Sequence, residues 1–331
     1  MPPRILIIGT GSIGERHLRC FQNTERCAEV SFCEPIESRR QEIAERYGVE
    51  GHASWEAAVA ARDIDVAVIA APAPAHIPLA LSLAEREIDL LVEKPLSLSL
   101  EGVGDLVETV TRRGVRATVG FVYRSLPALA HLRGEALSGA IGGVVQVQVQ
   151  AGQHFPFYRP AYREIYYAEP AMGGGLIQDM LPHPLNAVEW IVGPATRVVA
   201  DAVHAVLPGV AVEDTVNVLT RHGQVLGSFS LNQHQPVNEF VITVHGDRGS
   251  LRWRMKDHSW LIASDPGGDW IVRESFEHDR DGFYMLQAHG FLDYLEGKSG
   301  NPCPLEDAIA TVRSTLAVLE SRETSQWVEV S

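Results

Sequence analysis

Residues 5–14 read Ile-Leu-Ile-Ile-Gly-Thr-Gly-Ser-Ile-Gly, and this stretch decides the fold of the first part of the chain. The four aliphatic residues predict a strand buried on both faces, as strands of parallel sheets are. The glycines that follow have the spacing G-x-G-x-x-G, and residues 13–21 continue with helical character. Gly9 permits a tight turn, Gly11 leaves room for a pyrophosphate, and Gly14 lets the helix lie close to the strand.

An acidic side chain follows the glycines at the sequence spacing that is typical of ribose recognition. Glu34 lies twenty residues after Gly14 and closes a second short apolar run, residues 30–33. A carboxylate there accepts hydrogen bonds from the adenosine ribose hydroxyls, while the N-terminus of the helix offers N–H donors to the phosphates. Strand, glycines, helix, strand and acid in this order predict a nicotinamide dinucleotide site. The alternative is a glycine-rich turn that binds no ligand.

The same carboxylate bears on the choice of cofactor. Glu34 would face the 2′-phosphate of NADP, and two negative charges at about 4 Å repel by about 1 kcal/mol even in water. Arg39 and Arg40 follow closely in the sequence and would soften this repulsion. We therefore expect NAD, with NADP as the less favoured cofactor.

Length, charge and cysteine content limit the classes of protein to consider. A chain of 331 residues favours two domains, and 45% hydrophobic with 21% charged residues indicates a soluble globular protein. No apolar run reaches the length of a membrane span, and the first strand starts too close to Met1 for a signal peptide, so we expect a cytoplasmic protein. The net charge of −14 argues against nucleic acid and membrane surfaces as partners. The four cysteines lack metal-ligand spacing, and we expect no metal site.

Residues 1–122 alternate short apolar runs with helical patterns. This alternation predicts an α/β domain with a doubly wound parallel sheet of the Rossmann type. Beyond the first strand and helix, strands are expected at residues 30–34, 66–70, 89–92 and 116–121, and helices at 36–47, 75–86 and 99–113. The pattern changes near Tyr123, and we place the domain boundary there.

Residues 123–331 have the pattern of an α+β domain with an open, mostly antiparallel sheet. Residues 144–150 alternate apolar and polar side chains, which is typical of a sheet with one solvated or interfacial face. A large exposed sheet favours a homodimer or homotetramer. Further strands are expected at 196–206, 214–220, 225–233, 239–245 and 250–253, with hairpin turns at 222–223 and 247–249. Residues 307–322 predict a long amphipathic helix, for which packing back on the first domain is one option.

One short motif in the first domain has the composition of a reactive site. Glu93-Lys94-Pro95 directly follows a predicted strand, at the sheet edge where open α/β sheets bind ligands. A lysine beside a bound nicotinamide can exchange a proton with an alcohol. The alternative is a solvated lysine at the end of a strand.

A second candidate group is Asp179, His183 and Asn186. These residues lie on one face if their segment is a single helix, and would then form a polar stripe. Pro182 and Pro184 oppose this arrangement, because an interior proline costs about 3 kcal/mol or more. The sequence leaves open whether the helix kinks or two short helices meet. The alternative to a site is a set of capping or solvated polar residues.

Residues 153–167 are rich in aromatic and basic side chains. This composition suits stacking on a sugar face and binding of hydroxyls or a carboxylate. An oligomer contact is the alternative, because tyrosine and arginine also favour interfaces. The candidates in this loop are His154, Tyr158, Arg159, Tyr162 and Arg163, and His234 is a weaker candidate later in the chain.

Taken together, these motifs resemble the Gfo/Idh/MocA family of oxidoreductases, named after glucose–fructose oxidoreductase and inositol dehydrogenase. The motifs are GTGSIGERH at 9–17, APAPAH at 71–76, EKP at 93–95, GFVYR at 120–124 and GGGLIQDMLPHPLN at 173–186. The resemblance implies a Rossmann domain and a C-terminal domain whose sheet often forms the oligomer interface. It also implies nicotinamide-dependent oxidation of a ring hydroxyl on a sugar, sugar derivative or cyclitol.

By motif position, Lys94 corresponds to the family's lysine, and Asp179 and His183 to its acid–histidine pair. We expect Lys94 to bond to the reacting oxygen, His183 to accept or relay the proton, and Asp179 to orient the imidazole or bind a neighbouring hydroxyl. The expected cofactor contacts are Gly9, Thr10, Gly11, Ser12, Ile13, Gly14, Glu34, Ala71, Pro72, His76, Glu93 and Lys94. The expected substrate contacts are Arg124, His154, Tyr158, Arg159, Tyr162, Arg163, Asn186 and His234.

The chain departs from the family pattern at four of these positions. Leu181 replaces a glycine between the acid and the histidine, and Asn186 replaces a later aspartate. Ala71 and Ala73 replace threonine and asparagine. We expect these departures to affect the choice of substrate and the route of the proton more than the binding of the cofactor.

Two other functions fit parts of the pattern. One is an NAD-dependent glycosidase that oxidises a hydroxyl, eliminates and reduces again, with no net NADH. The other is a non-catalytic nicotinamide sensor, which the joint presence of Lys94, Asp179 and His183 disfavours.

Overall fold

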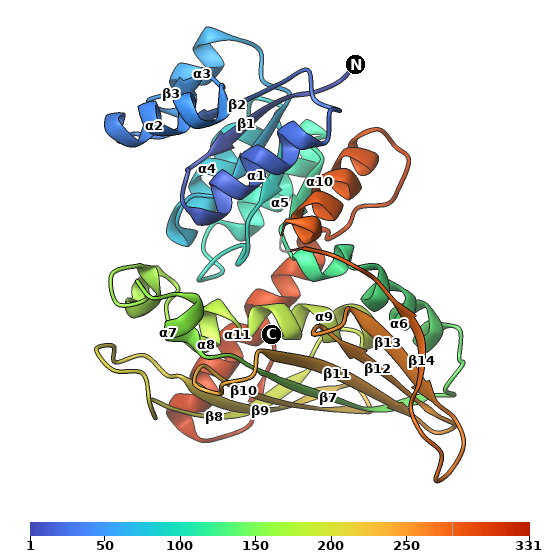
Figure 1. Cartoon of the computed structure of the whole chain (residues 1–331). Coiled ribbons are helices and arrows are strands. Elements are labelled where there is room, and N and C mark those ends of the chain that lie inside the picture. The colour runs from blue at the N-terminus through green and yellow to red at the C-terminus, as the bar shows by residue number, and fades with distance from the viewer. Residues whose placement is uncertain (280) are drawn as a thin grey trace. The chain divides into compact units, whose positions relative to one another are not determined.

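The computed structural model describes residues 1–279 and 281–331 and divides into two compact units. The first unit comprises Met1–Ser125 together with Asp279–Glu306. The second comprises Leu126–His278 together with Asp307–Ser331. Each unit is built around one β-sheet (Figure 1).

A six-stranded parallel sheet forms the centre of the first unit. Its strands are β1 (Arg4–Ile8), β2 (Glu29–Cys33), β3 (Gly51–His52), β4 (Val66–Ile69), β5 (Asp89–Val92) and β6 (Ala117–Val119), in the spatial order β3-β2-β1-β4-β5-β6. The order reverses between β1 and β4, which is the topological switch point of a doubly wound sheet. The predicted Rossmann fold is confirmed.

Helices follow the strands as the alternating pattern predicts. They are α1 (Ser12–Asn23), α2 (Glu37–Tyr47), α3 (Trp55–Ala61), α4 (His76–Ala84) and α5 (Val103–Arg113). The helix predicted from Ser99 begins only at Val103, because Gly102 adopts the left-handed conformation with a φ of 69°. Ile5 and Ile7 on one face and Leu6 on the other have no exposed surface, so β1 is buried on both faces as expected.

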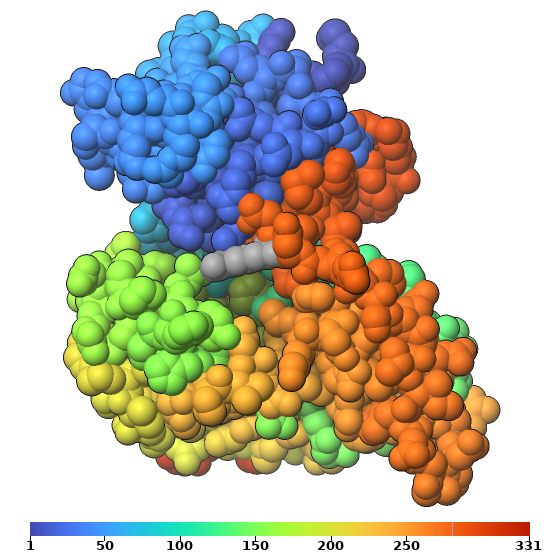
Figure 2. Space-filling model, viewed as in Figure 1, coloured from blue at the N-terminus to red at the C-terminus, as the bar shows by residue number. Residues whose placement is uncertain are grey.

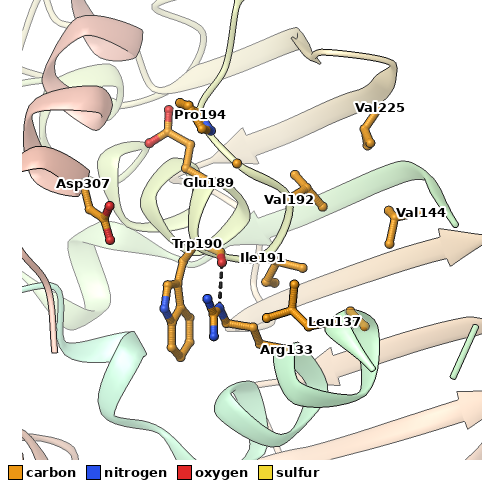
Figure 3. A pocket seen from close by; sticks show the side chains of 12 residues that line it. Arg133, Leu137, Val144, Glu189, Trp190, Ile191, Val192, Pro194, Val225 and Asp307 are labelled. Atoms are coloured by element: carbon orange, nitrogen blue, oxygen red, sulfur yellow. Dashed lines mark hydrogen bonds between the residues drawn. The ribbon is translucent and has the colours of Figure 1, made fainter. Parts of the chain in front are cut away.

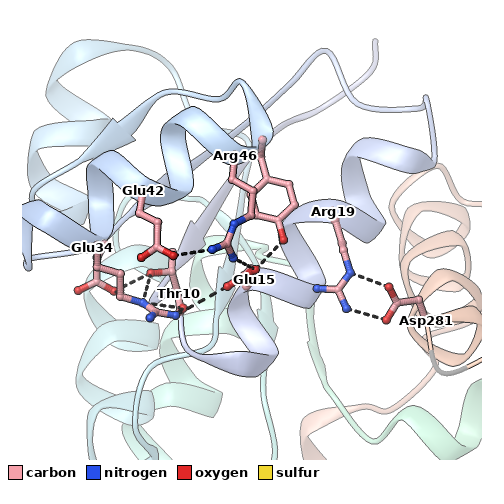
Figure 4. Close-up of polar contacts among 9 residues, drawn as sticks. Thr10, Glu15, Arg19, Glu34, Glu42, Arg46 and Asp281 are labelled. Carbon is pink, nitrogen blue, oxygen red and sulfur yellow. Dashed lines mark hydrogen bonds and ion pairs between the residues drawn. The ribbon is translucent and has the colours of Figure 1, made fainter.

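A helix far along the sequence completes the core of the first unit. Helix α10 (Gly282–Leu295) packs against α1 and contributes Phe291 to the core that includes β1. Asp281 accepts a hydrogen bond from Arg16 at 3.1 Å. It also accepts one from Arg19 at 2.6 Å (Figure 4). In Figure 2 the orange surface of this segment lies against the blue surface of the N-terminal part. The sequence pattern does not single out this helix.

A nine-stranded sheet forms the centre of the second unit. Its strands are β7 (Val144–Gly152), β8 (Arg197–Val203), β9 (Thr215–His222), β10 (Val225–Asn232), β11 (Glu239–Gly246), β12 (Ser250–Arg254), β13 (Ser259–Ala263), β14 (Ile271–Ser275) and β15 (Val328–Glu329), in the order β14-β13-β12-β11-β7-β10-β9-β8-β15. Neighbouring strands are antiparallel except β7 and β10, which run parallel. The open, mostly antiparallel sheet is therefore confirmed.

Helices cover one face of this sheet and leave the other exposed. The covering helices are α6 (Pro127–Leu137), α8 (Leu176–Asp179), α9 (Pro182–Val192) and α11 (Leu305–Thr324) (Figure 1). In β7, Val147 and Val149 are buried, whereas Gln148 and Gln150 are exposed. The predicted period of two in this strand is confirmed.

A buried polar network holds helix α11 against α9. Glu189 accepts hydrogen bonds from Thr311 at 2.6 Å and from Ser314 at 2.5 Å. Asn186 donates from Nδ2 to Thr311 Oγ1 at 3.0 Å. A buried polar group without its partner costs about 1–3 kcal/mol, so the network fixes the position of α11 on the second unit. None of the described helices combines the length and hydrophobicity that a membrane crossing demands.

We predict that Gly14→Ala destabilises the protein more than Gly104→Ala. A Cβ at Gly14 would lie 1.9 Å from the carbonyl oxygen of Gly9, and such overpacking costs about 1–3 kcal/mol. A Cβ at Gly104, in helix α5, would meet no atom within 4 Å, so that variant should match or slightly exceed wild-type stability. Denaturant unfolding of both variants measures the difference. Equal stabilities would contradict the close approach of α1 to β1.

Candidate functional site

The turn after β1 has the geometry of a phosphate-binding loop. Gly9 has a φ of 89°, which residues with a side chain rarely adopt. Gly14 lets α1 approach β1 closely, whereas a Cβ at Gly11 would meet nothing within 4 Å, so the backbone there faces open space. Ser12 and Ile13 begin helix α1 and supply N–H groups at its positive end. This cradle fits the pyrophosphate of a dinucleotide.

Glu34 lies directly after β2 with its carboxylate anchored on both oxygens. Oε2 accepts a hydrogen bond from Thr10 Oγ1 at 2.6 Å, and Oε1 accepts from the backbone N–H of Ile36 at 3.1 Å (Figure 4). Arg39 donates to the carbonyl oxygen of Thr10 at 3.0 Å, and its Nε lies 3.8 Å from Oε2 of Glu34. Arg40 donates to the carbonyl oxygen of Glu34 at 2.6 Å. The acid is thus fixed at the end of β2, where a doubly wound sheet binds the ribose.

Lys94 follows β5, and its neighbour Glu93 is buried. Oε1 of Glu93 lies 2.6 Å from Nε2 of His17, on α1, and Oε2 accepts the backbone N–H of Lys94 at 3.0 Å. Burial alone would raise the pKa of Glu93, but the hydrogen bonds from His17 and from the Lys94 backbone outweigh it and lower this pKa. The carboxylate is therefore ionised at neutral pH.

His76 joins the loops that follow β4 and β5. Its Nε2 lies 2.8 Å from the carbonyl oxygen of Ala71, and its Nδ1 lies 2.8 Å from that of Pro95. Burial lowers the pKa of His76, so the ring is neutral and donates from one nitrogen at a time. His76 thereby positions both loops. Pro72, in the loop after β4, is exposed.

Asp179 and His183 lie on two short helices, not on one. Helix α8 ends at Asp179 and α9 begins at Pro182, so no continuous helical face carries both residues. Pro182 and Pro184 occupy the first turn of α9, where backbone N–H groups have no helical partner. Tyr166 donates from its hydroxyl to Asp179 Oδ1 at 2.8 Å and orients that carboxylate.

Residues just before β9 hold the surrounding backbone in place. Glu213 Oε1 accepts the N–H of Ile177 in helix α8 at 3.0 Å. Asp214 accepts backbone N–H groups from residues 205–207. Burial would raise the pKa of Asp214, but these hydrogen bonds lower it, so the carboxylate stays ionised. Glu213 thus fixes the helix that ends at Asp179, and Asp214 fixes the loop at 205–207.

His234 has a defined tautomer. Thr215 Oγ1 donates its single hydrogen to Asp214 at 2.9 Å and therefore accepts from Nε2 of His234 at 3.1 Å. Nδ1 of His234 is consequently the acceptor nitrogen. The preceding residue, Gln233, donates to the sulfur of Met180 at 3.7 Å. This contact brings the end of β10 and the corner between α8 and α9 to the same end of the sheet.

The aromatic and basic loop after β7 has a buried part and an exposed part. Tyr162 packs with Phe155, donates its hydroxyl to the carbonyl oxygen of Pro208 at 2.6 Å, and is 1% exposed. Arg163 lies over the Tyr162 ring at 4.8 Å. The candidates with accessible surface are His154, Tyr158, Arg159 and Arg163.

Three of the expected substrate residues are buried. Tyr162 belongs to the core of the loop, and Asn186 belongs to the network with Thr311. Arg124 is 6% exposed in a 3₁₀ turn, residues 122–125 of the first unit. We therefore leave Tyr162 and Asn186 out of the substrate contacts proposed below.

A pocket of about 510 Å³ opens at the start of β7 and β10 (Figure 3). Its walls are mostly apolar, and Arg133 donates to the carbonyl oxygen of Trp190 at 2.7 Å while stacking on its ring at 4.7 Å. None of its lining residues belongs to the expected site. His154 and His234 follow the opposite ends of the same two parallel strands.

The described residues offer no cluster of metal ligands, and three of the four cysteines are buried. Across residues 1–279 and 281–331, no group of three or more His, Cys, Asp or Glu side chains is arranged to hold a metal ion. Burial raises the pKa of the Cys20 thiol to about 11 and that of Cys33 to about 12. These two thiols are protonated and unreactive near neutral pH.

Sequence reasoning did not assign roles to His17, Tyr166 and Thr215. His17 lies three residues after Gly14, one helical turn further along the same helix, so the helical period was a usable signal. Thr215 is a polar residue that directly follows two acids at the start of a predicted strand. Tyr166 carries no comparable signal, because its contact with Asp179 is set by the loop.

Comparisons with known proteins agree with this architecture. A model described as "Oxidoreductase family, NAD-binding Rossmann fold" matches residues 3–121, and the GFO/IDH/MocA C-terminal domain model matches residues 130–252. The chain is 28% identical to myo-inositol dehydrogenase Hyg17 of Streptomyces leeuwenhoekii, over 97% of this chain and 94% of that protein. Its match to the rhizopine catabolism protein MocA of Rhizobium meliloti, at 25% identity, covers 57% of each. The structure of levoglucosan dehydrogenase with NADH has the same fold, with a TM-score of 0.90 at 21% identity over 100% of both chains.

We predict that Glu34→Gln increases the affinity for NADP relative to NAD by about tenfold or more. The substitution removes a negative charge whose repulsion of a 2′-phosphate exceeds about 1 kcal/mol near a protein surface, and leaves Arg39 and Arg40 in place. Glu37→Gln, at an exposed position on α2, is the matched control and should change neither affinity. Calorimetric titration of both cofactors measures the ratio. An unchanged ratio in Glu34→Gln would remove Glu34 from cofactor selection.

Proposed function

Because the chain belongs to the Gfo/Idh/MocA family of NAD-binding oxidoreductases, we propose that it transfers hydride between NAD and a ring hydroxyl of a sugar or cyclitol. The observation that carries the proposal is a lysine at the carboxyl end of β5, in the unit whose glycine turn and acid fit NAD. The relatives named myo-inositol dehydrogenase, D-apiose dehydrogenase and levoglucosan dehydrogenase support the substrate class.

Lys94 binds the reacting oxygen in this proposal. Only three of the 28 basic residues are lysines, and the other two are Lys256 and Lys298. Arginine does not release its proton in proteins, so among these 28 residues only a lysine can exchange a proton with an alcohol. NAD, when bound, supplies the hydride acceptor. The chain itself aligns the reacting groups and manages the proton.

His183 accepts the proton in this proposal, and Asp179 orients the substrate or the imidazole. Support comes from the Tyr166 hydroxyl, which holds the Asp179 carboxylate at 2.8 Å. His234 offers Nδ1 as an acceptor for a substrate hydroxyl, since Thr215 occupies its other nitrogen. The remaining proposed substrate contacts are Arg124, His154, Tyr158, Arg159 and Arg163.

We also propose that the protein works in the cytoplasm. All four cysteines are free, and the pKa of three of the thiols is raised by burial. Free thiols without disulfides are typical of a reducing compartment.

The exposed sheet face supports a homodimer or homotetramer. Leu219 and Leu226 are 51% and 42% exposed, and Leu226 pairs across strands with Gln146 on the same face as Gln148 and Gln150. The two leucines lie among uncharged glutamines, while Arg221 beside Leu226 and the charged residues of the flanking strands (Arg197, Asp201, Arg252 and Arg254) share the same face. A self-complementary contact between two copies covers such a face under two-fold symmetry.

Incubation with NAD and a panel of sugars and inositols tests the function, and Lys94 variants test the mechanism. We expect NADH formation with one class of substrate. Lys94→Ala should lower turnover by about 10²–10⁴-fold while NAD affinity changes little, and Lys94→Arg should not restore turnover because arginine keeps its proton. Lys298→Ala, at an exposed lysine paired with Glu296, is the control. Near-normal turnover in Lys94→Ala would remove the lysine from the mechanism, and product sugar without net NADH would indicate the glycosidase.

We predict that light scattering gives a mass of at least twice 36.3 kDa for the wild type at micromolar concentration. Introducing Leu219→Glu together with Leu226→Glu should shift the protein toward the monomer, because each copy would bury two carboxylates in the contact. Val237→Glu, at a 54% exposed loop position, is the matched control and should leave the mass unchanged. A wild-type protein of monomer mass would rule out the assembly.

A further inference from the structure

A buried pair of ionisable side chains connects the phosphate-binding helix to the lysine loop. His17 on α1 is 1% exposed, and Glu93 is 6% exposed. Oε1 of Glu93 lies 2.6 Å from Nε2 of His17, although 76 positions separate the two residues in the chain. The other oxygen accepts the backbone N–H of Lys94 at 3.0 Å. One carboxylate therefore touches both the helix and the loop.

Packing alone does not account for this pair. An apolar pair of similar volume is often neutral or stabilising in place of a buried ionic pair. The carboxylate adds a fixed geometry. Its two oxygens lie in one plane, and each is held by a separate hydrogen bond. The pair therefore defines the orientation of the backbone that it contacts.

The surroundings leave the pair a single arrangement. A Cβ at Gly120, directly after β6, would lie 3.0 Å from Oε1 of Glu93 and would crowd the carboxylate. The His17 ring packs edge-on against Tyr284, with 5.6 Å between centroids, and its Nδ1 is buried with no hydrogen-bond partner among the described residues. An ionised carboxylate only accepts hydrogen bonds, so Nε2 carries the hydrogen.

We propose that His17 and Glu93 form a clamp that fixes the backbone at Lys94, which makes both of them positioning residues for that lysine. The inference rests on the role of Lys94 in the proposed function. Displacing a reacting group by about 1 Å costs about 10²-fold in rate. Opening the clamp therefore lowers kcat, while the glycine turn and Glu34 still bind NAD.

Two neutral substitutions of His17 test the clamp. His17→Gln keeps an amide N–H near the position of Nε2, whereas His17→Asn is too short to reach Glu93. We expect His17→Asn to lower kcat by about 10- to 100-fold with small changes in KM and in the Kd for NAD. His17→Gln should recover most of kcat. A role in stability alone would lower the unfolding midpoint of both variants without this split between kcat and KM.

A second readout needs no substrate. Because the chain has three lysines, peptide mass spectrometry can follow the reductive methylation of Lys94, Lys256 and Lys298 separately. His17→Asn should raise the labelling rate of Lys94 severalfold and leave the other two rates unchanged, and His17→Gln should label as wild type does. If His17→Asn does not fold, Glu93→Gln serves instead, since its amide cannot accept both hydrogen bonds.

The outcomes separate the clamp from the proposed function. Lys94 labelling and kcat at wild-type values in His17→Asn overturn the clamp, as does an equal change at all three lysines. If the wild type oxidises no sugar or cyclitol, the proposed function is overturned. The clamp is still supported in that case if His17→Asn changes the labelling of Lys94 alone.

Discussion

The first unit depends on how closely helix α1 approaches strand β1. The missing Cβ of Gly14 sets that distance, because any side chain there would collide with the carbonyl oxygen of Gly9. Two other features follow from it. The start of α1 lies beside the turn, where its N–H groups can meet a phosphate, and His17 reaches across to Glu93 at 2.6 Å. A helix packed one ångström farther out would lose that hydrogen bond.

The second unit depends in a similar way on three residues before and at the start of β9. Glu213 holds helix α8, Asp214 holds the loop at 205–207, and Thr215 holds the ring of His234. Two acidic side chains and one hydroxyl thus organise the backbone of this part of the second unit. Such groups are costly to bury without partners, and here backbone N–H groups satisfy them.

The sequence predicted the elements whose burial pattern is regular, and missed those that depend on distant contacts. The glycine turn, the acid after β2 and the alternation in β7 each follow from a local rule, and each has its expected place in the structure. Strand β14 has five exposed residues and so carries no alternation to detect. The sequence left open whether the segment of Asp179 and His183 is one kinked helix or two short ones, and the structure has two because the prolines start a new helix. Asn186 could not be placed from sequence, because its partner Thr311 lies 125 positions away.

The division of the chain also shapes how it is made. The first 125 residues leave the ribosome well before α10, so the nascent first unit lacks Phe291 and exposes apolar side chains such as Phe21. At about 5–20 residues per second, the delay is about 10–30 s. The second unit, in turn, is complete only when α11 has been added. Both cores therefore become complete near the end of translation. A chaperone that binds apolar segments would find the most exposed apolar surface on this chain before α10 has been synthesised.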